Sequence, residues 1–505
     1  MSDELPEGWA KAKLADVTTR VPNVKPESEP SREFAYVDIS AVDRERNQIV
    51  EPSVRRFCGK DAPSRARRPI ESGDVLFSNV RTNLRNVAAV PDPAPAQLCS
   101  NGFTVLRSNG AVLPLYLLRS VLTDEFTAAV SETQTGTHYP ATTDAQVFDQ
   151  AIRVPPLAEQ HRIVAKVEAL LEQVRRTKDR LDRVPLILKR FRQAVLAAAC
   201  SGQLTEGWRR DRIVIEPATD VLRKIAAKRI ELGLPSARRV LDTEGIALPE
   251  TELPESWCWC RVGQIADVRL GGTPARKDAS YWNGDVPWVS SGEVANCRIA
   301  TTAERITVLG LENSNAKLYP PGTVLIAMIG EGKTRGQSAI LDVLASTNQN
   351  VAGLVFDAAH VEAEYVWLWA LSEYEKNRDA GRGGNQPALN GAKVRALPVP
   401  LPPLEEQQEI VLRVKRVLNL LDATERRVLQ ASRQANALPQ AILCKAFAGE
   451  LVPTEAELAR AEGRDYETAE QLLERVRAQS EELTTKGKRP RPASPRGRSR
   501  STSNT

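Results

Sequence analysis

The most constraining feature of this 505-residue chain is that it repeats itself. The segment LPEGW at 5–9 returns as LPESW at 253–257, and PPLAEQHRIV at 155–164 returns as PPLEEQQEIV at 402–411, with seven of ten positions identical. The two shifts, 248 and 247 residues, differ by only one residue, so both matches belong to the same repeat. A repeat of this length means that one module occurs twice, and the fold must contain two copies of it.

Each copy begins with a part rich in glycine, proline, threonine and β-branched residues, which is typical of short strands joined by turns. Strand-like runs include GDVLFSNV at 73–80, GTVLIAMI at 322–329 and VAGLVFD at 351–357. The sequence therefore predicts two β-rich α/β domains, at 1–153 and 251–399.

The second part of each copy, at 154–250 and 400–485, carries apolar residues at three- and four-residue steps, which indicates a long amphipathic helix. A Pro-Pro pair and a following Glu-Gln pair suit the first turn of each helix. Gly202 and Gly449 come just after the last periodic residues, where a left-handed C′ residue is expected. Pro185 is expected to kink or split the first helix.

Two helices of equal length with matching apolar stripes are most simply buried against each other. Because a β-rich domain separates them along the chain, they can run antiparallel. The predicted fold class is α+β: two pseudo-symmetric copies of a β-rich domain plus a long helix, the long helices pairing as an antiparallel coiled-coil-like rod with a globular domain at each end. Pairing of each helix with another subunit is the alternative.

Composition argues against several classes of protein. No stretch approaches the ~18 uncharged apolar residues of a membrane span, and MSDELPEGWAK lacks a signal-peptide core. Seven cysteines without paired spacing favour a reducing compartment, and three histidines offer little material for metal or triad chemistry. We expect a cytoplasmic protein without a metal site or a membrane partner.

The C-terminal segment 486–505 carries seven Lys or Arg residues and no acid. The whole chain has a net charge of +5, so the remainder is slightly acidic and bulk charge does not by itself indicate a nucleic-acid partner. With few apolar residues to bury, the segment is predicted to be a disordered basic tail. Its expected role is a solubilising terminus or a weak contact with DNA.

The order of β-rich domain, P-P-L-x-E-Q helix, β-rich domain and P-P-L-x-E-Q helix resembles the DNA-specificity subunit of Type I restriction–modification systems. The first domain shares LPEGW, GDVLFSNVR and GTHYPA with that family but has no counterpart to WVSSGEV, as expected if it reads a different sequence. The resemblance covers about 1–480. Segments similar to one target-recognition domain of the family are GGTPARKDASYWNGDVPWVSSGEV (271–294), IGEGKTRGQSAI (329–340), STNQNVAGL (346–354) and GGNQPALNG (383–391).

The resemblance implies that each β-rich domain reads one half of a bipartite, asymmetric DNA site. The helical regions would set the spacer and dock two methyltransferase subunits, which carry S-adenosylmethionine. Separate motor–nuclease subunits would carry ATP with magnesium, so this chain would bind double-stranded DNA without a cofactor or catalytic residues of its own. Two unlike domains can specify a non-palindromic target, whereas a homodimer imposes palindromy.

In the first domain, the stretches SRARRP (64–69) and NVRTNLRN (79–86) supply candidate DNA contacts, mainly to phosphate, of which about half are expected to be used. A histidine in the loop at 136–140 suits a base contact or a structural hydrogen bond equally. These candidates are Arg65, Arg67, Arg68, Asn79, Arg81, Asn83, Arg85 and His138.

In the second domain, small polar side chains beside a strand end suit contacts with base edges or phosphates, and Asn or Gln can pair bidentately with adenine. Trp282 is expected to be a core aromatic residue that frames a turn. The candidate DNA contacts are Thr273, Arg276, Lys277, Ser290, Ser291, Glu293, Lys333, Arg335, Gln337, Asn385 and Gln386.

Glu159, Gln160, Glu406 and Gln407 lie in the first helical turns of both copies. They are candidates for the subunit interface. Capping and interdomain hydrogen bonding is the stronger explanation of why both copies carry them.

Two other functions compete with the resemblance. AMIGEGKT at 327–334 satisfies a relaxed phosphate-loop pattern, but such a loop must open a helix, and here the strand-like run SAILDV follows. A P-loop NTPase, recognisable by ATP turnover that depends on Lys333, is therefore the weaker alternative. A stand-alone DNA-binding regulator with the same repeat is the other, and it would bind tightly without a methyltransferase.

Overall fold

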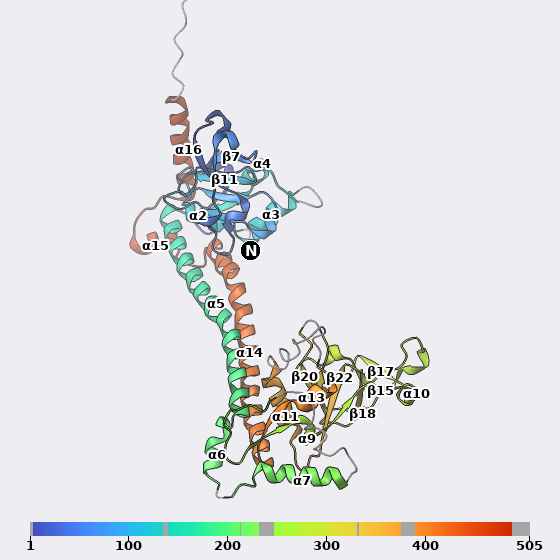
Figure 1. The fold of residues 1–505 in the computed structure, drawn as a ribbon. Helices are drawn as coiled ribbons and strands as arrows, with labels where there is room; N and C mark the ends of the chain where they lie inside the picture. The colour runs from blue at the N-terminus through green and yellow to red at the C-terminus, as the bar shows by residue number, and fades with distance from the viewer. Residues whose placement is uncertain are drawn as a thin grey trace, which may run out of the picture. The chain divides into compact units, whose positions relative to one another are not determined.

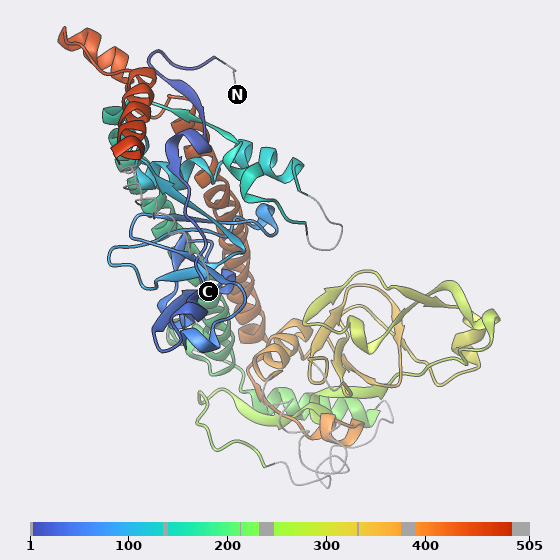
Figure 2. The same cartoon turned by 90° about the horizontal axis from the view of Figure 1, so that it is seen from above.

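The computed structural model describes residues 4–134, 140–212, 214–231, 247–330, 333–374 and 389–486. It consists of two compact units (Figures 1 and 2). Unit 1 combines Met1–Asp182 with Ala431–Thr505, and unit 2 is Arg183–Gln430. The boundaries between the units fall inside the two long helices, so each unit contains residues from both copies of the repeat.

Unit 1 is built on two four-stranded sheets, of order β6-β3-β10-β7 and β2-β11-β8-β9, with the pairs β1-β12 and β4-β5 beside them. Its strands are β1 Ala10–Lys13, β2 Thr18–Thr19, β3 Glu33–Val37, β4 Val42–Asp43, β5 Gln48–Ile49, β6 Arg55–Cys58, β7 Ala66–Pro69, β8 Val75–Ser78, β9 Val87–Ala89, β10 Leu98–Ser100, β11 Phe103–Ser108 and β12 Ala151–Val154. Its shorter helices are α1 Leu14–Val17, α2 Pro114–Ser120, α3 Asp124–Glu132, α4 Asp144–Phe148, α15 Glu455–Glu462 and α16 Ala469–Lys486.

Unit 2 contains a five-stranded sheet, β14-β22-β19-β20-β16, a four-stranded sheet, β17-β15-β21-β18, and the pair β13-β23. Its strands are β13 Cys258–Arg261, β14 Ala266–Leu270, β15 Trp282–Val289, β16 Cys297–Ile299, β17 Glu304–Ile306, β18 Leu318–Tyr319, β19 Val324–Ala327, β20 Ser338–Leu341, β21 Ala345–Thr347, β22 Val351–Phe356 and β23 Pro398–Leu401. Its shorter helices are α6 Glu206–Arg210, α7 Ala218–Glu231, α9 Val262–Ile265, α10 Val308–Glu312, α11 Ala363–Ser372 and α13 Gly391–Ala396.

The two long helices are α5, Leu157–Cys200, and α14, Leu404–Phe447. In unit 1 the start of α5, at Ile163 and Val167, shares a buried cluster with the end of α14, at Leu443 and Phe447. In unit 2 the end of α5 and the start of α14 share another. The predicted antiparallel pairing is therefore confirmed within each unit.

The ends of the long helices follow the predicted signals. Each helix begins directly after its Pro-Pro pair, and Gly202 and Gly449 adopt φ of +79° and +77°. Of the two outcomes predicted for Pro185, a kink or a split of α5, the split is wrong, because the helix runs through this proline, as α14 runs through Pro439. A proline inside a helix removes one backbone hydrogen bond, and the buried apolar contacts on both sides of Pro185 hold the remaining turns.

Each unit joins the β-rich domain of one copy to the segment that follows the long helix of the other copy. In unit 1 the amide of Ala469, the first residue of α16, donates to the carbonyl of Gly8 at 2.9 Å. In unit 2 the amide of Ala218, the first residue of α7, donates to the carbonyl of Ser256 at the same distance. The red C-terminal helix α16 accordingly lies beside the blue N-terminal strands in both views (Figures 1 and 2).

The predicted domain boundaries stay predictions, since the compact units divide the chain differently. Lys486, the first residue of the predicted basic tail, is the last residue of α16. The other tail residues, 487–505, lie outside the described part of the chain.

Candidate nucleic-acid interface

The first turn of α5 anchors the β-rich domain of unit 1. Glu159 is fully buried, and its carboxylate accepts hydrogen bonds from Trp9 Nε1 at 2.9 Å and from the amide of Glu455 at 2.8 Å. Gln160, also fully buried, accepts from the amide of Leu113 and donates to the carbonyl of Ala111 at 3.0 Å. Burial raises the pKa of Glu159.

The same construction recurs in the first turn of α14. Glu406 is fully buried and accepts hydrogen bonds from Trp257 Nε1 at 2.8 Å, from Thr205 Oγ1 at 2.7 Å and from Arg209. Gln407, equally buried, accepts from the amide of Glu362 at 2.8 Å.

The subunit-interface role predicted for Glu159, Gln160, Glu406 and Gln407 stays a prediction, and the burial of these residues argues against direct contact. None of the four side chains is exposed to solvent, so none offers a surface to another subunit. Their polar atoms bond to the β-rich domain and to the segment after the other long helix, which is the hydrogen-bonding role that the sequence also suggested.

Two of the predicted DNA contacts in unit 1 are held by one carboxylate. Arg68 forms an ion pair with Asp144 at 2.5 Å, and its side chain is only 12% exposed. Asn79 is buried, donates to the same carboxylate at 3.0 Å and accepts from Thr104 Oγ1 at 2.7 Å. Arg68 and Asn79 thus stabilise the domain from within.

Arg67 and Arg85 are also engaged within unit 1. Arg67 donates two hydrogen bonds of 2.6 Å to the carboxylate of Glu27, which lowers the pKa of that carboxyl. Arg85 pairs with Asp124.

The remaining described candidates of unit 1 lie at the surface. Arg65, Arg81 and Asn83 are exposed. Arg81 and Arg85 have φ of +50° and +53° and bracket a short 3₁₀ turn, Thr82–Leu84. Two non-glycine residues in the left-handed region around one turn present Asn83 and Leu84 to solvent.

In unit 2 the predicted contacts begin with an arginine that stacks on two tryptophans. The Arg276 guanidinium lies 3.9 Å from the ring centre of Trp282 and 4.9 Å from that of Trp288. The two rings meet edge to face, with centroids 5.2 Å apart, and Trp288 is buried. Arg276 also pairs with Glu304. Trp282 is half-buried and packs against the buried cluster of Trp288, Ile306 and Ala316, and Lys277, next to Arg276, is exposed.

The polar residues after β15 form a cap. Ser290 donates its hydroxyl and its amide to Glu293, and the other carboxylate oxygen of Glu293 accepts from the amide of Ala303 at 2.9 Å. Ser291 is 3.5 Å from the amide group of Asn348, and Thr273 bonds to Gln349. Glu293 therefore fixes the loop that presents Ser291.

The loop between β19 and β20 carries three further candidates. Lys333 is exposed, Gln337 is half-buried and Arg335 is buried, 8% exposed. The loop joins two antiparallel strands, whereas a phosphate loop opens a helix. The strand–loop–strand connection supports the prediction that a P-loop NTPase is the weaker alternative. His138, Asn385 and Gln386 lie outside the described residues.

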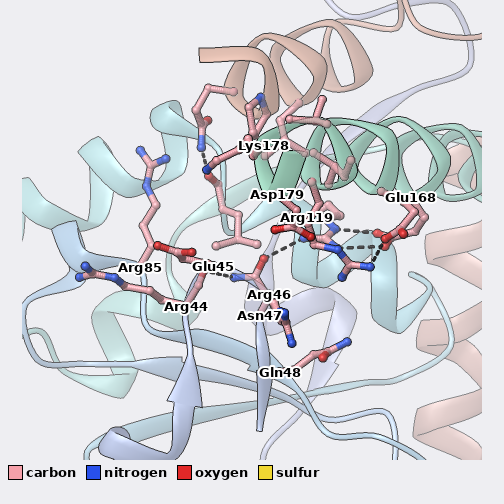
Figure 3. Close-up of a pocket in the computed structure, with 18 of the residues that line it drawn as sticks. Arg44, Glu45, Arg46, Asn47, Gln48, Arg85, Arg119, Glu168, Lys178 and Asp179 are labelled. Atoms are coloured by element: carbon pink, nitrogen blue, oxygen red, sulfur yellow. Dashed lines mark hydrogen bonds and ion pairs between the residues drawn. The ribbon is translucent and has the colours of Figure 1, made fainter. Parts of the chain in front are cut away.

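Sequence reasoning missed the β4–β5 hairpin of unit 1. It forms one wall of a cleft of about 410 Å³ whose other walls come from α5 and α14, and Arg44 and Arg46 stand at its edge (Figure 3). Asn47, with φ of +55°, holds the hairpin by accepting from Arg119 at 2.9 Å. The run Asp-Arg-Glu-Arg-Asn, in which Asp43 accepts from the amide of Glu45, is the turn signal that could have revealed it.

Among the described residues, no three His, Cys, Asp or Glu side chains lie close enough together to hold a metal ion. A search of the same residues finds no helix able to cross a membrane.

Comparison with known proteins agrees with this architecture. The family model described as Type I restriction modification DNA specificity domain matches residues 254–431. The specificity subunit of the Type I restriction enzyme EcoKI from Escherichia coli K12 is 26% identical over 498 residues, covering 94% of this chain and 96% of that protein. The chain is thus similar to Type I restriction–modification DNA-specificity subunits.

Two further members show how far the similarity extends. The specificity subunit of the E. coli enzyme EcoDI is 28% identical over 365 residues, covering 69% of this chain and 73% of its own length. The crystal structure of the HsdS subunit from Thermoanaerobacter tengcongensis superposes with a TM-score of 0.62 at 28% identity and covers 88% of this chain and 98% of that one. A specificity-family fold therefore extends over most of the chain.

Proposed function

We propose that this chain is the DNA-reading subunit of a Type I restriction–modification complex and that each unit reads one half of a bipartite, asymmetric site. One observation carries the proposal: both units share the Glu-Gln anchor in the first helical turn, whereas their surface loops differ. Unit 1 presents the left-handed turn at Asn83, and unit 2 presents the loop around Arg276. A shared Glu-Gln anchor combined with different surface loops suits the reading of two different half-sites.

The side chains proposed to meet DNA are those that the structure leaves at the surface of these loops. In unit 1 they are Arg65, Arg81 and Asn83, and in unit 2 they are Lys277 and Lys333. Arginine and lysine would supply contacts to phosphate or to guanine, and Asn83 could pair with adenine. Arg67, Arg68, Asn79, Arg85 and Arg276 would instead position the loops.

We further propose that the chain neither catalyses nor binds a cofactor. S-adenosylmethionine would reside on two methyltransferase subunits, and ATP with magnesium on motor–nuclease subunits, in a cytoplasmic complex. Apolar side chains on the long helices suit the docking of such partners, since Leu186, Ile187 and Phe191 of α5 are each at least half exposed.

Mapping methylated bases across the genome of the host, with and without the gene, tests the proposal. We expect a methylated motif with two unlike half-sites and a fixed spacer that disappears with the gene. Lys277→Ala should reduce methylation of the motif by weakening the contact with one half-site only. Lys60→Ala, a surface change outside the reading loops, should have little effect. A palindromic motif, or an unchanged methylome without the gene, would rule out this function.

A further inference from the structure

One position on the long helices carries opposite charges in the two copies. Glu168 of α5 and Lys415 of α14 are equivalent, 247 residues apart, and each faces a helix of the β-rich domain in its own unit. Glu168 accepts from Arg119 Nε at 2.7 Å and from its Nη2 at 3.0 Å (Figure 3). Lys415 pairs with Glu364 of α11. The ion pair between domain and helix is thus reversed.

Both ion pairs belong to larger networks that fix the domain on its helix. Arg119 is only 12% exposed and also donates to Asn47, so it links α5 to the β4–β5 hairpin. Glu364, 15% exposed, also accepts from Arg298 at 2.5 Å, and Arg298 pairs with Asp342 at 2.6 Å. Each network connects the long helix to a strand or hairpin of the domain.

A second equivalent position also differs in charge, but its two ion pairs are of different kinds. Arg162 of α5 pairs with the buried carboxylate of Glu455 at 2.7 Å. Its counterpart, Glu409, pairs with Arg413 of the same helix at 2.6 Å, so this second pair is internal to α14.

Other contacts between the β-rich domain and the long helix match in the two copies. In both units the glutamate accepts from the tryptophan of the LPExW motif, and the glutamine accepts from a backbone amide of the β-rich domain. Tyr116 and Tyr365 also make matching bonds, from their hydroxyls to the carbonyls of Arg153 and Pro400. Glu168 and Lys415 therefore differ in charge at positions where many neighbouring contacts are the same in both copies.

We propose that the reversed ion pairs Arg119–Glu168 and Glu364–Lys415 determine specificity, so that each β-rich domain packs only on its own long helix. A domain on the wrong helix would place Arg119 opposite Lys415, or Glu364 opposite Glu168. Like charges in partly buried contacts repel, and such repulsion is an effective means of excluding a wrong partner. The proposal does not depend on DNA binding.

A domain-duplication chimera tests whether these ion pairs make the packing specific. In the full chain, residues 253–401 are replaced by 5–154, so that Arg119 faces Lys415. We expect Lys415→Glu to raise the thermal unfolding midpoint of this chimera by about 2–4 °C and to lower that of the parent chain by a similar amount. Lys415→Gln is the matched neutral control. In each chain its unfolding midpoint should lie between that of the chain with Lys415 and that of the Lys415→Glu variant.

The opposite signs in chimera and parent are the decisive result, and both shifts should shrink in 1 M salt, because Lys415 is half exposed. Shifts of the same sign, or none in either chain, would overturn the proposal. If the chimera does not fold, the parent chain still gives a test: Glu168→Lys should lower the midpoint, and adding Arg119→Glu should recover at least half of the loss. No recovery in the double variant would also overturn the proposal.

Discussion

Pro6 packs against Gly449 so closely that a Cβ atom on the glycine would lie 2.5 Å from Cγ of the proline. The same contact joins Pro254 to Gly202, at 2.6 Å. In both pairs the proline comes from the start of one copy and the glycine from the end of the long helix of the other. The proline of each LPExW motif thus packs against the end of the long helix of the other copy.

Replacing either glycine by alanine should destabilise its unit by about 1–3 kcal/mol, because the left-handed φ and the neighbouring proline both oppose a side chain. Gly463→Ala is the matched control: Gly463 also has a positive φ, but nothing lies within 4 Å of the position that a Cβ atom would occupy there. It should cost only ~1 kcal/mol. Urea unfolding of the three variants measures the difference, and equal losses would show that the proline contact does not matter.

The buried carboxylate of Glu406 should contribute far more to the stability of unit 2 than the carboxylate of the neighbouring Glu405. Glu406→Gln keeps the shape but removes the charge that faces Arg209, and we expect a loss of about 2–3 kcal/mol. Glu405→Gln, one residue away and exposed beside Arg212, should cost less than ~0.5 kcal/mol. Thermal unfolding at neutral pH checks both values, and similar losses would contradict this role for Glu406.

The stability of unit 1 should depend on pH through Glu455. Burial alone would raise the pKa of this carboxyl, but hydrogen bonds from Arg162 and Arg464 outweigh burial and lower it. The ionised carboxylate therefore stabilises the fold above about pH 4.5, its ordinary pKa, and this contribution is lost as pH falls through the lowered value. The advantage of the wild type over Glu455→Gln should shrink below pH 4.5.

Glu159, beside it, provides the internal contrast. Burial raises its pKa, so the folded state takes up a proton first, and the wild type should gain stability relative to Glu159→Gln as pH falls toward 4.5. Unfolding curves of both variants between about pH 3.5 and 7, with the exposed Glu462→Gln as a control, follow the two trends. Parallel pH profiles for the two variants would refute the assigned directions.

If the long helices set the spacer, matched insertions should lengthen it. Four residues added to α5 alone would turn later side chains away from α14 and destabilise the pairing. Four residues added to both helices at facing positions would lengthen each by ~6 Å, close to two base pairs at about 3.4 Å each. We expect methylation of targets with graded spacers to shift by roughly two base pairs, with unchanged half-sites. An unchanged spacer would show that the helices do not measure the distance.

Much of the fold follows from local signals. The Pro-Pro pairs, the periodic apolar residues and the two αL glycines place α5 and α14, and the β-branched runs become β8, β19 and β22. The continuity of α5 through Pro185 was missed, because the packing that compensates for the lost hydrogen bond comes from elsewhere in the chain.

The candidate site was harder to predict, because a basic side chain does not reveal its partner. Arg67 pairs with a carboxylate 40 residues away, and Arg276 with one 28 residues away. The sequence around each arginine looks the same whether the guanidinium meets a phosphate or an acid of the same chain. Only the fold separates the exposed Lys277 from the engaged Arg276.

Because unit 1 takes its parts from both ends of the sequence, the two units cannot be completed in the order in which they begin. Residues 183–430 form unit 2 from one continuous stretch, whereas residues 1–182 need 431–486 to cover Trp9 and Glu159. At a synthesis rate of roughly 5–20 residues per second, the N-terminal domain waits on the order of 15–60 s on the ribosome for the segment that closes it. The first domain to be made is therefore the last to be finished.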